Sequence, residues 1–156
     1  MANPSAHAKA VETKLSRSVL VGIAILSLAG MIVSSISLQR HYAKSATSYC
    51  EFGEKFNCDI VNRSEYSSVM GIPVSLIGVA GYGLLLTLST LCRSRPETAT
   101  RLLMAASAGL VFALYLTYIE AYVLTTWCIL CLTSLALMAS ITALAGLLKL
   151  RLATNA

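Results

Sequence analysis

Residues 102–148 read LLMAASAGLVFALYLTYIEAYVLTTWCILCLTSLALMASITALAGLL, and this stretch decides the fold. It contains two apolar runs, 102–124 and 128–148, in which Glu120 is the only Asp, Glu, Lys or Arg. Each run is close to the roughly 20 residues that a helix needs to cross about 30 Å of hydrocarbon. Backbone amides cannot stay unpaired in lipid, so uninterrupted apolar runs of this length indicate helices. The stretch therefore predicts two membrane helices joined by a very short turn.

Two further apolar runs, 19–38 and 72–91, precede that stretch. Hydrophobic residues make up 56% of the chain and charged residues only 12%, which lies outside the usual composition of a soluble domain. The first run is longer than the usual signal-peptide core of about 7–15 residues, so we expect it to stay in the protein. We predict an all-α integral membrane four-helix bundle that forms a single domain over residues 1–156.

The charges predict how this bundle is oriented. Basic side chains precede the first run, occupy the loop between the second and third runs, and follow the last run. They are Lys9, Lys14, Arg17, Arg93, Arg95, Arg101, Lys149 and Arg151. Positively charged flanks stay in the cytoplasm, so we expect both termini there. In the loop 39–71 acidic residues balance the basic ones, and we place it on the outer side. This topology accounts for the net charge of +5 without a nucleic-acid partner.

The predicted topology sorts the five cysteines. Cys50, Cys58, Cys128 and Cys131 fall on the outer side, where a bacterial periplasm or an endoplasmic reticulum lumen permits disulfides. Cys92 falls on the cytoplasmic side, and we predict no role for it. The separation of four cysteines from one indicates that the four act as a set.

The spacing of Cys128 and Cys131 predicts a redox pair. Cysteines three residues apart in a helix share one face and can close a disulfide with little rearrangement. Cys128 is expected in the first turn of the last helix, where free N–H groups and the helix dipole stabilise a thiolate. Cys131 is expected one turn deeper in the membrane. We therefore predict that Cys128 exchanges with a protein disulfide and that Cys131 faces an apolar electron acceptor.

Cys50 and Cys58 are separated by seven residues in the polar outer loop. Gly53 and Asn57 suit a mobile turn that closes a disulfide, so this pair is predicted to act as a shuttle. Two alternatives stay open. The disulfides can be purely structural, in a membrane protein without catalysis. Four thiolates can also hold zinc, but that would leave the deep placement of Cys131 unexplained, and we predict no metal.

Several motifs together resemble the vitamin K epoxide reductase family. They are the Cys-x7-Cys loop pair, Cys-Asp-Ile-Val-Asn-Arg-Ser at 58–64, Gly-Ile-Pro-Val-Ser-Leu-Ile-Gly at 71–78 and Trp-Cys-Ile-Leu-Cys at 127–131. The resemblance covers the four-span core. It implies that Cys128 and Cys131 form the active site and that Cys131 reduces a quinone. It also implies that Cys50 and Cys58 carry electrons from a thioredoxin-like partner, and that Ser64 lies near the quinone pocket.

Departures from the family pattern indicate which branch the chain resembles. Leu135 stands where vertebrate enzymes have a tyrosine after the active pair, and Val74 where they have a substrate-binding asparagine. The segment Gly-Ile-Pro-Val-Ser is similar to the bacterial branch. That resemblance implies the bacterial inner membrane, a separate thioredoxin-like (DsbA-like) periplasmic oxidase as partner, and ubiquinone or menaquinone as acceptor. Reduction of vitamin K epoxide is the alternative activity. Because the chain ends at Ala156, we expect no fused thioredoxin domain.

The third apolar run offers candidates for quinone contacts. Phe112, Tyr115, Tyr118 and Tyr122 recur near helical spacing and can line a pocket beside Cys131. Ordinary packing or an interfacial aromatic belt explains the same pattern. Glu120 is a further candidate, since carboxylates inside a membrane are often functional, although it can also reach out to the outer interface.

Overall fold

The computed structural model describes residues 4–42, 57–91 and 97–154, with side chains from Ser16 onward and without that of Arg63. Most of the described chain is helical. The α-helices are α1 (Pro4–Tyr42), α2 (Cys58–Arg63), α3 (Val74–Thr90), α4 (Thr98–Ile119) and α5 (Ile129–Thr154). A 3-10 turn (Glu65–Ser67) and a short antiparallel hairpin of β1 (Ser68–Val69) and β2 (Ile72–Pro73) connect α2 to α3. A π-helical turn (Glu120–Leu124) extends α4.

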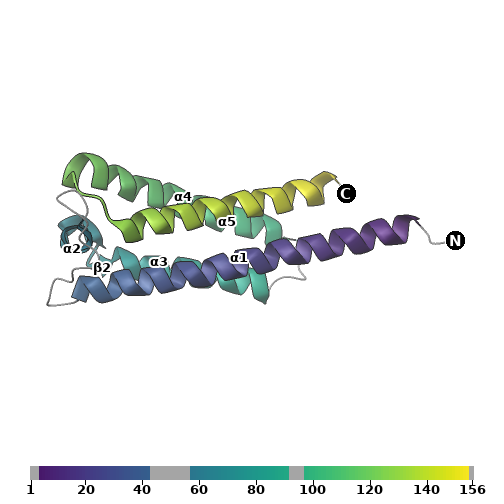
Figure 1. Cartoon of the computed structure of the whole chain (residues 1–156), viewed down its shortest axis with the longest axis horizontal. Helices are drawn as coiled ribbons and strands as arrows, with labels where there is room; N and C mark the ends of the chain where they lie inside the picture. Colours follow the sequence, from purple (N-terminus) through teal and green to yellow (C-terminus); the bar gives the residue numbers. More distant parts are fainter. Residues whose placement is uncertain (1–3, 43–56, 92–96, 155–156) are drawn as a thin grey trace.

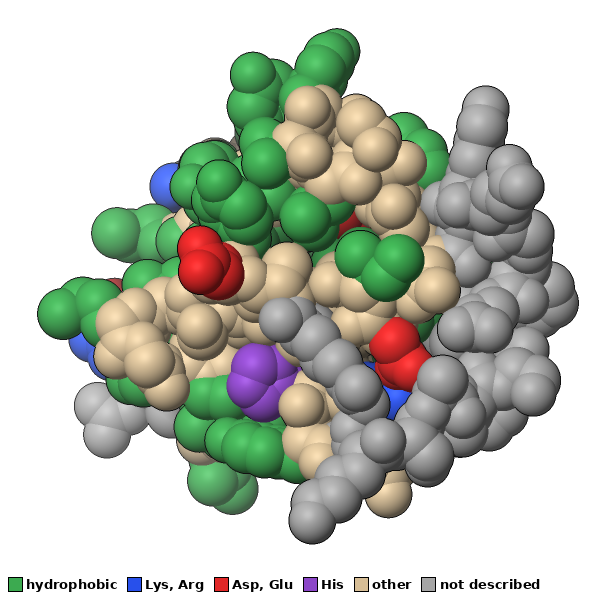
Figure 2. Space-filling model, turned by 90° about the vertical axis from the view of Figure 1, so that its left-hand side faces the viewer, with side chains coloured by type: hydrophobic (Ala, Val, Ile, Leu, Met, Phe, Trp, Pro, Cys, Tyr) green, Lys and Arg blue, Asp and Glu red, His purple; other side chains and the backbone are tan. Residues whose placement is uncertain are grey.

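The long helices α1, α3, α4 and α5 run lengthwise beside one another (Figure 1). Helix α1 packs against α3 and α5, while α4 packs against α5 and α3. The short helix α2 and strand β2 lie at one end of this bundle, and both chain termini lie at the other. Figure 2 looks onto the α2 end, where acidic, histidine and other polar side chains gather among apolar ones.

The helices have the character of membrane helices. Among the described residues, Ser16–Tyr42, Thr98–Leu124 and Ile129–Thr154 are long and apolar enough to span a bilayer. Apolar side chains also cover the outside of the bundle, among them Ile25, Ile32, Leu84, Val111 and Leu147. Helices that are apolar all round belong in lipid or in a protein core. The predicted membrane protein with apolar helices is confirmed, whereas four spans and the cytoplasmic side of the termini stay predictions.

Helix α3 is shorter than the sequence predicted. The expected run was 72–91, but Ile72 and Pro73 belong to β2 and the helix begins only at Val74. Proline lacks an N–H and pushes the preceding residue toward extended backbone, so Pro73 ends the hairpin and sets the start of α3. With 17 residues, α3 is a short apolar helix beside the longer candidate spans.

A close approach between α1 and α3 fixes the centre of the bundle. The ring of Tyr82 is buried against Gly30, and a Cβ atom added at Gly30 would overlap that ring. Small residues at helix contacts let backbones approach closely in membranes, where packing rather than hydrophobic burial holds helices together. The surrounding core draws on every long helix, with Ile23 from α1, Leu85 from α3, Leu102 from α4 and Ile141 from α5.

We expect Gly30→Ala to destabilise the bundle by about 1–3 kcal/mol, because the added methyl group must displace a buried ring. Gly81→Ala is the matched control, since a Cβ atom there has no neighbour within 4 Å. It should be neutral or stabilise α3 by up to about 1 kcal/mol. Thermal unfolding in detergent compares the two variants. Equal melting temperatures would contradict the close packing of α1 on α3.

Candidate active site at the α2 end of the bundle

Cys128 and Cys131 meet at the start of α5. Cys128 precedes the helix and its carbonyl accepts the N–H of Leu132 at 3.0 Å, while Cys131 lies in the first turn. The Cys128 side chain is fully buried, and Cys131 is partly buried. Both thiols are free, and their sulfur atoms lie within 4.8 Å of each other. This separation lets a disulfide form with a small movement of the side chains.

The surroundings of Cys128 favour its thiolate form. The side chain of Cys131 donates a hydrogen bond that lowers the pKa of Cys128, and the backbone N–H groups of Cys131 and Leu130 act in the same direction. Burial and the nearby Glu120 oppose them, but the pKa of Cys128 remains below its ordinary value. A thiolate is the form that attacks disulfides and leaves from them.

Cys58 is packed directly against this pair. It is the first residue of α2, is fully buried, and shares one apolar cluster with Val61 and Cys128. Cys58 is disulfide-bonded, and its partner is not among the described residues. Cys50, the partner that the sequence predicts, lies outside the described part of the chain, as does Cys92.

Asn57 docks α2 against the segment before Cys128. Its side-chain oxygen accepts the N–H groups of Asp59 and Ile60 at 3.0 and 3.1 Å, which caps the helix. Its own N–H donates to the carbonyl of Trp127 at 3.2 Å. The sequence predicted Asn57 in a mobile turn. In the structure it caps α2 and places Cys58 beside Cys128.

Glu120 points into the same cluster. It is only 2% exposed and begins the π-helical turn, a feature that is frequent at functional sites. Its Oε2 accepts the N–H of Cys128 at 3.0 Å, and its Oε1 has no hydrogen-bond partner among the described residues. The sequence allowed Glu120 either to point into the bundle or to reach out to the membrane interface. In the structure it points into the bundle.

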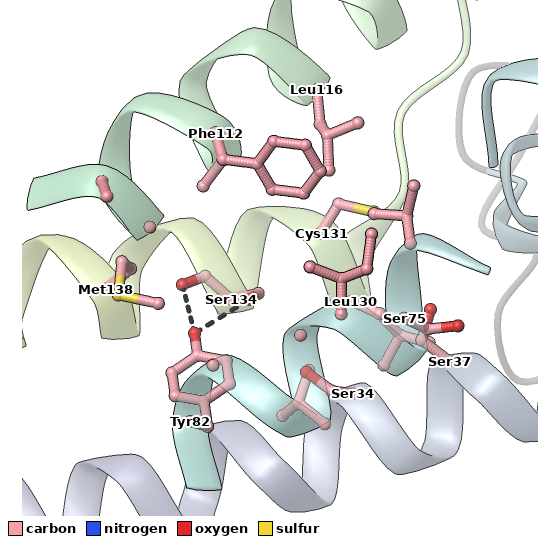
Figure 3. Close-up of a pocket in the computed structure, with 18 of the residues that line it drawn as sticks. Ser34, Ser37, Ser75, Tyr82, Phe112, Leu116, Leu130, Cys131, Ser134 and Met138 are labelled. Atoms are coloured by element: carbon pink, nitrogen blue, oxygen red, sulfur yellow. Dashed lines mark hydrogen bonds between the residues drawn. The ribbon is translucent and has the colours of Figure 1, made fainter. Parts of the chain in front are cut away.

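A cavity of about 310 Å³ opens between the long helices and reaches Cys131 (Figure 3). Its walls are mainly apolar, with Phe112 and Leu116 on the α4 side. Polar groups come from serines and from Tyr82, whose hydroxyl donates to the carbonyl of Ser134 at 2.9 Å. A largely apolar cavity of this size with a few convergent polar groups is typical of a small-molecule site.

The residues predicted to contact quinone fall in three places. Phe112 lines the large cavity, while Ser64 and Glu120 line a smaller one, of about 60 Å³, that also reaches Cys131. Tyr115 and Tyr118 are 57% and 59% exposed and line neither of these two cavities. Tyr118 instead packs against Tyr122, with ring centroids 4.8 Å apart. Outward-facing tyrosines near a helix end are typical of a membrane interface.

Sequence reasoning missed Tyr82 and Ser134. Ser134 follows Cys131 by three residues, so helical spacing places both on the same face of the helix. This spacing was a usable signal that Ser134 lies near the site. Tyr82 comes from α3, and no local pattern connects it with Cys131.

Glu120, Cys128 and Cys131 are also the one group within the described ranges whose potential metal-ligand atoms lie this close together. A dithiol that closes a disulfide needs the same proximity.

Comparison with known protein families identifies this arrangement. The model of the vitamin K epoxide reductase family matches residues 21–145, a range that includes Cys58, Cys128, Cys131 and the site built around them. The chain belongs to the vitamin K epoxide reductase family. The resemblance noted in the motifs is therefore confirmed, and membership makes the protein a membrane oxidoreductase of the thiol and quinone type.

The hydrogen bond from Cys131 yields a prediction about pH in this family member. In a Cys50→Ala/Cys58→Ala/Cys92→Ser background, Cys131→Ala should move the pH midpoint of Cys128 alkylation upward, because the thiolate loses a donor. Cys131→Ser retains a donating hydroxyl and should keep the lower midpoint. Intact mass spectrometry after timed exposure to iodoacetamide measures both profiles. Coincident midpoints would show that this hydrogen bond does not favour the thiolate.

Proposed function

We propose that this protein is a membrane thiol:quinone oxidoreductase that reoxidises a separate thioredoxin-like periplasmic oxidase and so supports disulfide bond formation. The observation that carries the proposal is the position of the paired cysteines between two environments. Cys58, held in a disulfide, is buried against Cys128, while Cys131 lines the apolar cavity between the helices. This arrangement fits thiol exchange with Cys58 at Cys128 and electron transfer to a lipid-soluble acceptor at Cys131.

The proposed route starts with two electrons from the partner. A partner dithiol attacks Cys50 and reduces a Cys50–Cys58 disulfide, and the partner leaves with its own disulfide formed. The Cys58 thiolate then attacks Cys128 of a Cys128–Cys131 disulfide, and Cys131 leaves as a thiolate. Cys50 attacks Cys58 in turn, which restores the loop disulfide and releases Cys128. Each exchange passes through a mixed disulfide and conserves electrons.

The second half of the route oxidises the dithiol. Cys128 and Cys131 give up two electrons and two protons, the quinone becomes a hydroquinone, and the Cys128–Cys131 bond forms again. The cavity beside Cys131 supports this step, because a quinone ring is flat and apolar with two polar oxygens. Phe112 offers a ring to pack against, and Ser134 and Tyr82 offer hydroxyl groups. We propose ubiquinone or menaquinone as the acceptor. Ser64 and Glu120, which line the smaller cavity at Cys131, are proposed as further contacts of the quinone.

We propose the bacterial inner membrane as the location, with α2 and the thiol site at the periplasmic face. The basic flanks of the apolar runs favour cytoplasmic termini. The two termini also lie together at the end opposite α2 (Figure 1), as an even number of crossings requires.

Reduction of vitamin K epoxide is the second candidate, favoured by the family that the chain belongs to. Val74 lines the cavity at the position where the vertebrate pattern has a substrate-binding asparagine, and Leu135 replaces the tyrosine of that pattern. These two replacements favour quinone over epoxide. Parallel assays of purified protein with each substrate distinguish the two activities.

We expect purified wild-type protein, supplied with a reduced thioredoxin-like oxidase, to reduce ubiquinone or menaquinone. Cys131→Ser should abolish quinone reduction, because the thiol that faces the acceptor is gone, and a Cys58–Cys128 link should accumulate. Quinone absorbance and non-reducing gels follow the two results. A wild type that consumes neither quinone would overturn the proposal, and a Cys131→Ser protein with lower stability but no link would favour purely structural disulfides.

Glu120→Gln should slow quinone reduction while leaving exchange between the loop disulfide and Cys128 intact. The amide oxygen of Gln can still accept the N–H of Cys128, but the side chain no longer takes up protons from the adjacent thiols. Single-turnover quinone reduction and partner reoxidation, measured in the same preparation, separate the two steps. Equal quinone rates in the variant and the wild type would exclude a protonic role for Glu120.

A further inference from the structure

Asn62 contacts both cysteines of the proposed exchange. It lies in the last turn of α2 and is only 6% exposed. Its side-chain Nδ2 donates to the carbonyl of Cys58 at 2.9 Å and to Sγ of Cys128 at 4.0 Å. Its Oδ1 accepts the hydroxyl of Ser37 at 2.6 Å. A single buried amide thus joins α1, α2 and the sulfur atom of Cys128.

The hydrogen-bond partners fix which way this amide points. A backbone carbonyl can only accept, so the NH₂ group must face Cys58, and the Ser37 hydroxyl then donates to the oxygen. One N–H of the amide bonds the Cys58 carbonyl, and the remaining N–H is left to face the sulfur of Cys128. Flipping the amide would place its oxygen against the Cys58 carbonyl, which loses that hydrogen bond and turns the N–H donors away from Cys128. The donor is therefore aimed at Cys128 before any reaction takes place.

Helix α1 also holds the backbone of this residue. Nδ1 of His41 lies 2.6 Å from the carbonyl oxygen of Asn62 and 3.3 Å from the hydroxyl of Ser67. The hydroxyl of Ser67 itself donates to the carbonyl of Ser64 at 2.7 Å. These contacts keep the end of α2 against α1, so the Asn62 side chain stays within reach of Cys128.

We propose that Asn62 is a further catalytic residue, which donates a hydrogen bond to the Cys128 sulfur and stabilises its negative charge during exchange with Cys58. The inference rests on the proposed relay and adds a residue to it. When Cys50 attacks Cys58 in the Cys58–Cys128 mixed disulfide, the S–S bond breaks and its electron pair stays on Cys128. A preorganised donor aimed at that sulfur lowers the barrier, as donors in an oxyanion hole do for oxygen.

The same donor acts in the reverse direction, in which the Cys128 thiolate attacks Cys58. Hydrogen bonds to a charged form favour that form, so Asn62 adds to the thiolate stabilisation that Cys131 provides. Among the other titratable groups, Glu120 of the π-helical turn acts on this sulfur, Asp59 follows Cys58 in the first turn of α2, and His41 of α1 contacts the backbone carbonyl of Asn62. Glu120 carries the opposite influence, because a carboxylate disfavours a neighbouring thiolate.

A Cys131→Ser/Cys92→Ser protein isolates this step without partner or quinone. Here Cys128 can attack Cys58 of the loop disulfide, which forms a Cys58–Cys128 link and releases the Cys50 thiol. Acid quenching, alkylation and peptide mapping give the rate of link formation at each pH. The midpoint of this pH profile reports the ionisation of Cys128, whereas a change in the rate alone reports how well α2 is positioned.

In this background we expect Asn62→Leu to move the midpoint upward by about one pH unit, which is a tenfold loss of thiolate below the midpoint. Asn62→Asp keeps an oxygen for Ser37 but loses the N–H donors, and should move the midpoint at least as far. His41→Ala is the matched control, since it loosens α2 without altering the amide and removes the histidine from the profile. It should leave the midpoint in place, even where the rate falls.

The outcomes separate this inference from the relay on which it rests. If the link forms in the parent protein and Asn62→Leu keeps the parent midpoint, Asn62 is not a donor to the thiolate and the inference fails alone. If His41→Ala shifts the midpoint as far as Asn62→Leu does, the effect comes from the position of α2 and the inference also fails. If the parent never forms the link at any pH, the relay itself is contradicted.

Discussion

The docking of α2 onto the start of α5 is the interaction on which the site depends. The N–H of Asn57 bonds the carbonyl of Trp127, and Cys58 and Val61 bury themselves against Cys128. A cysteine in a loop would otherwise meet the membrane pair only by chance encounter. Because α2 is capped by Asn57 and held by α1, the two sulfur-bearing residues stay together, and exchange between them becomes a local rearrangement. Effective concentrations in such preorganised pairs far exceed those of free partners.

The second constraint is that the two thiols of the α5 pair meet different surroundings. Cys128 lies before the helix, between the side-chain amide of Asn62 on α2, which donates to its sulfur, and the carboxyl group of Glu120, which accepts its backbone N–H. Cys131 is one turn further in and borders the largely apolar cavity. The helical rise alone creates this division, since three residues advance the chain by about 4.5 Å. In the proposed relay, the protein partner and the lipid-soluble acceptor are then served from opposite sides of one disulfide.

The apolar runs were enough to predict a helical membrane protein, because lipid leaves the backbone no alternative to helices or a closed barrel. Helical spacing and the family motifs likewise pointed to Cys128 and Cys131. The start of α3 was missed, although Pro73 is a local signal that could have corrected it. Asn62, Tyr82 and the inward position of Glu120 were beyond local reasoning. Each depends on how separate helices meet, as when Ser37 of α1 orients an amide of α2.

In the proposed relay, electrons leave through Cys128 and Cys131, and the loop pair communicates with the acceptor only through them. The most direct test mixes fully reduced protein with one equivalent of ubiquinone, without any partner, and maps disulfides after acid quenching at increasing times. The account predicts that the Cys128–Cys131 disulfide appears first and that the Cys50–Cys58 disulfide follows at its expense. Formation of the Cys50–Cys58 bond first, or in a protein that lacks Cys131, would contradict it.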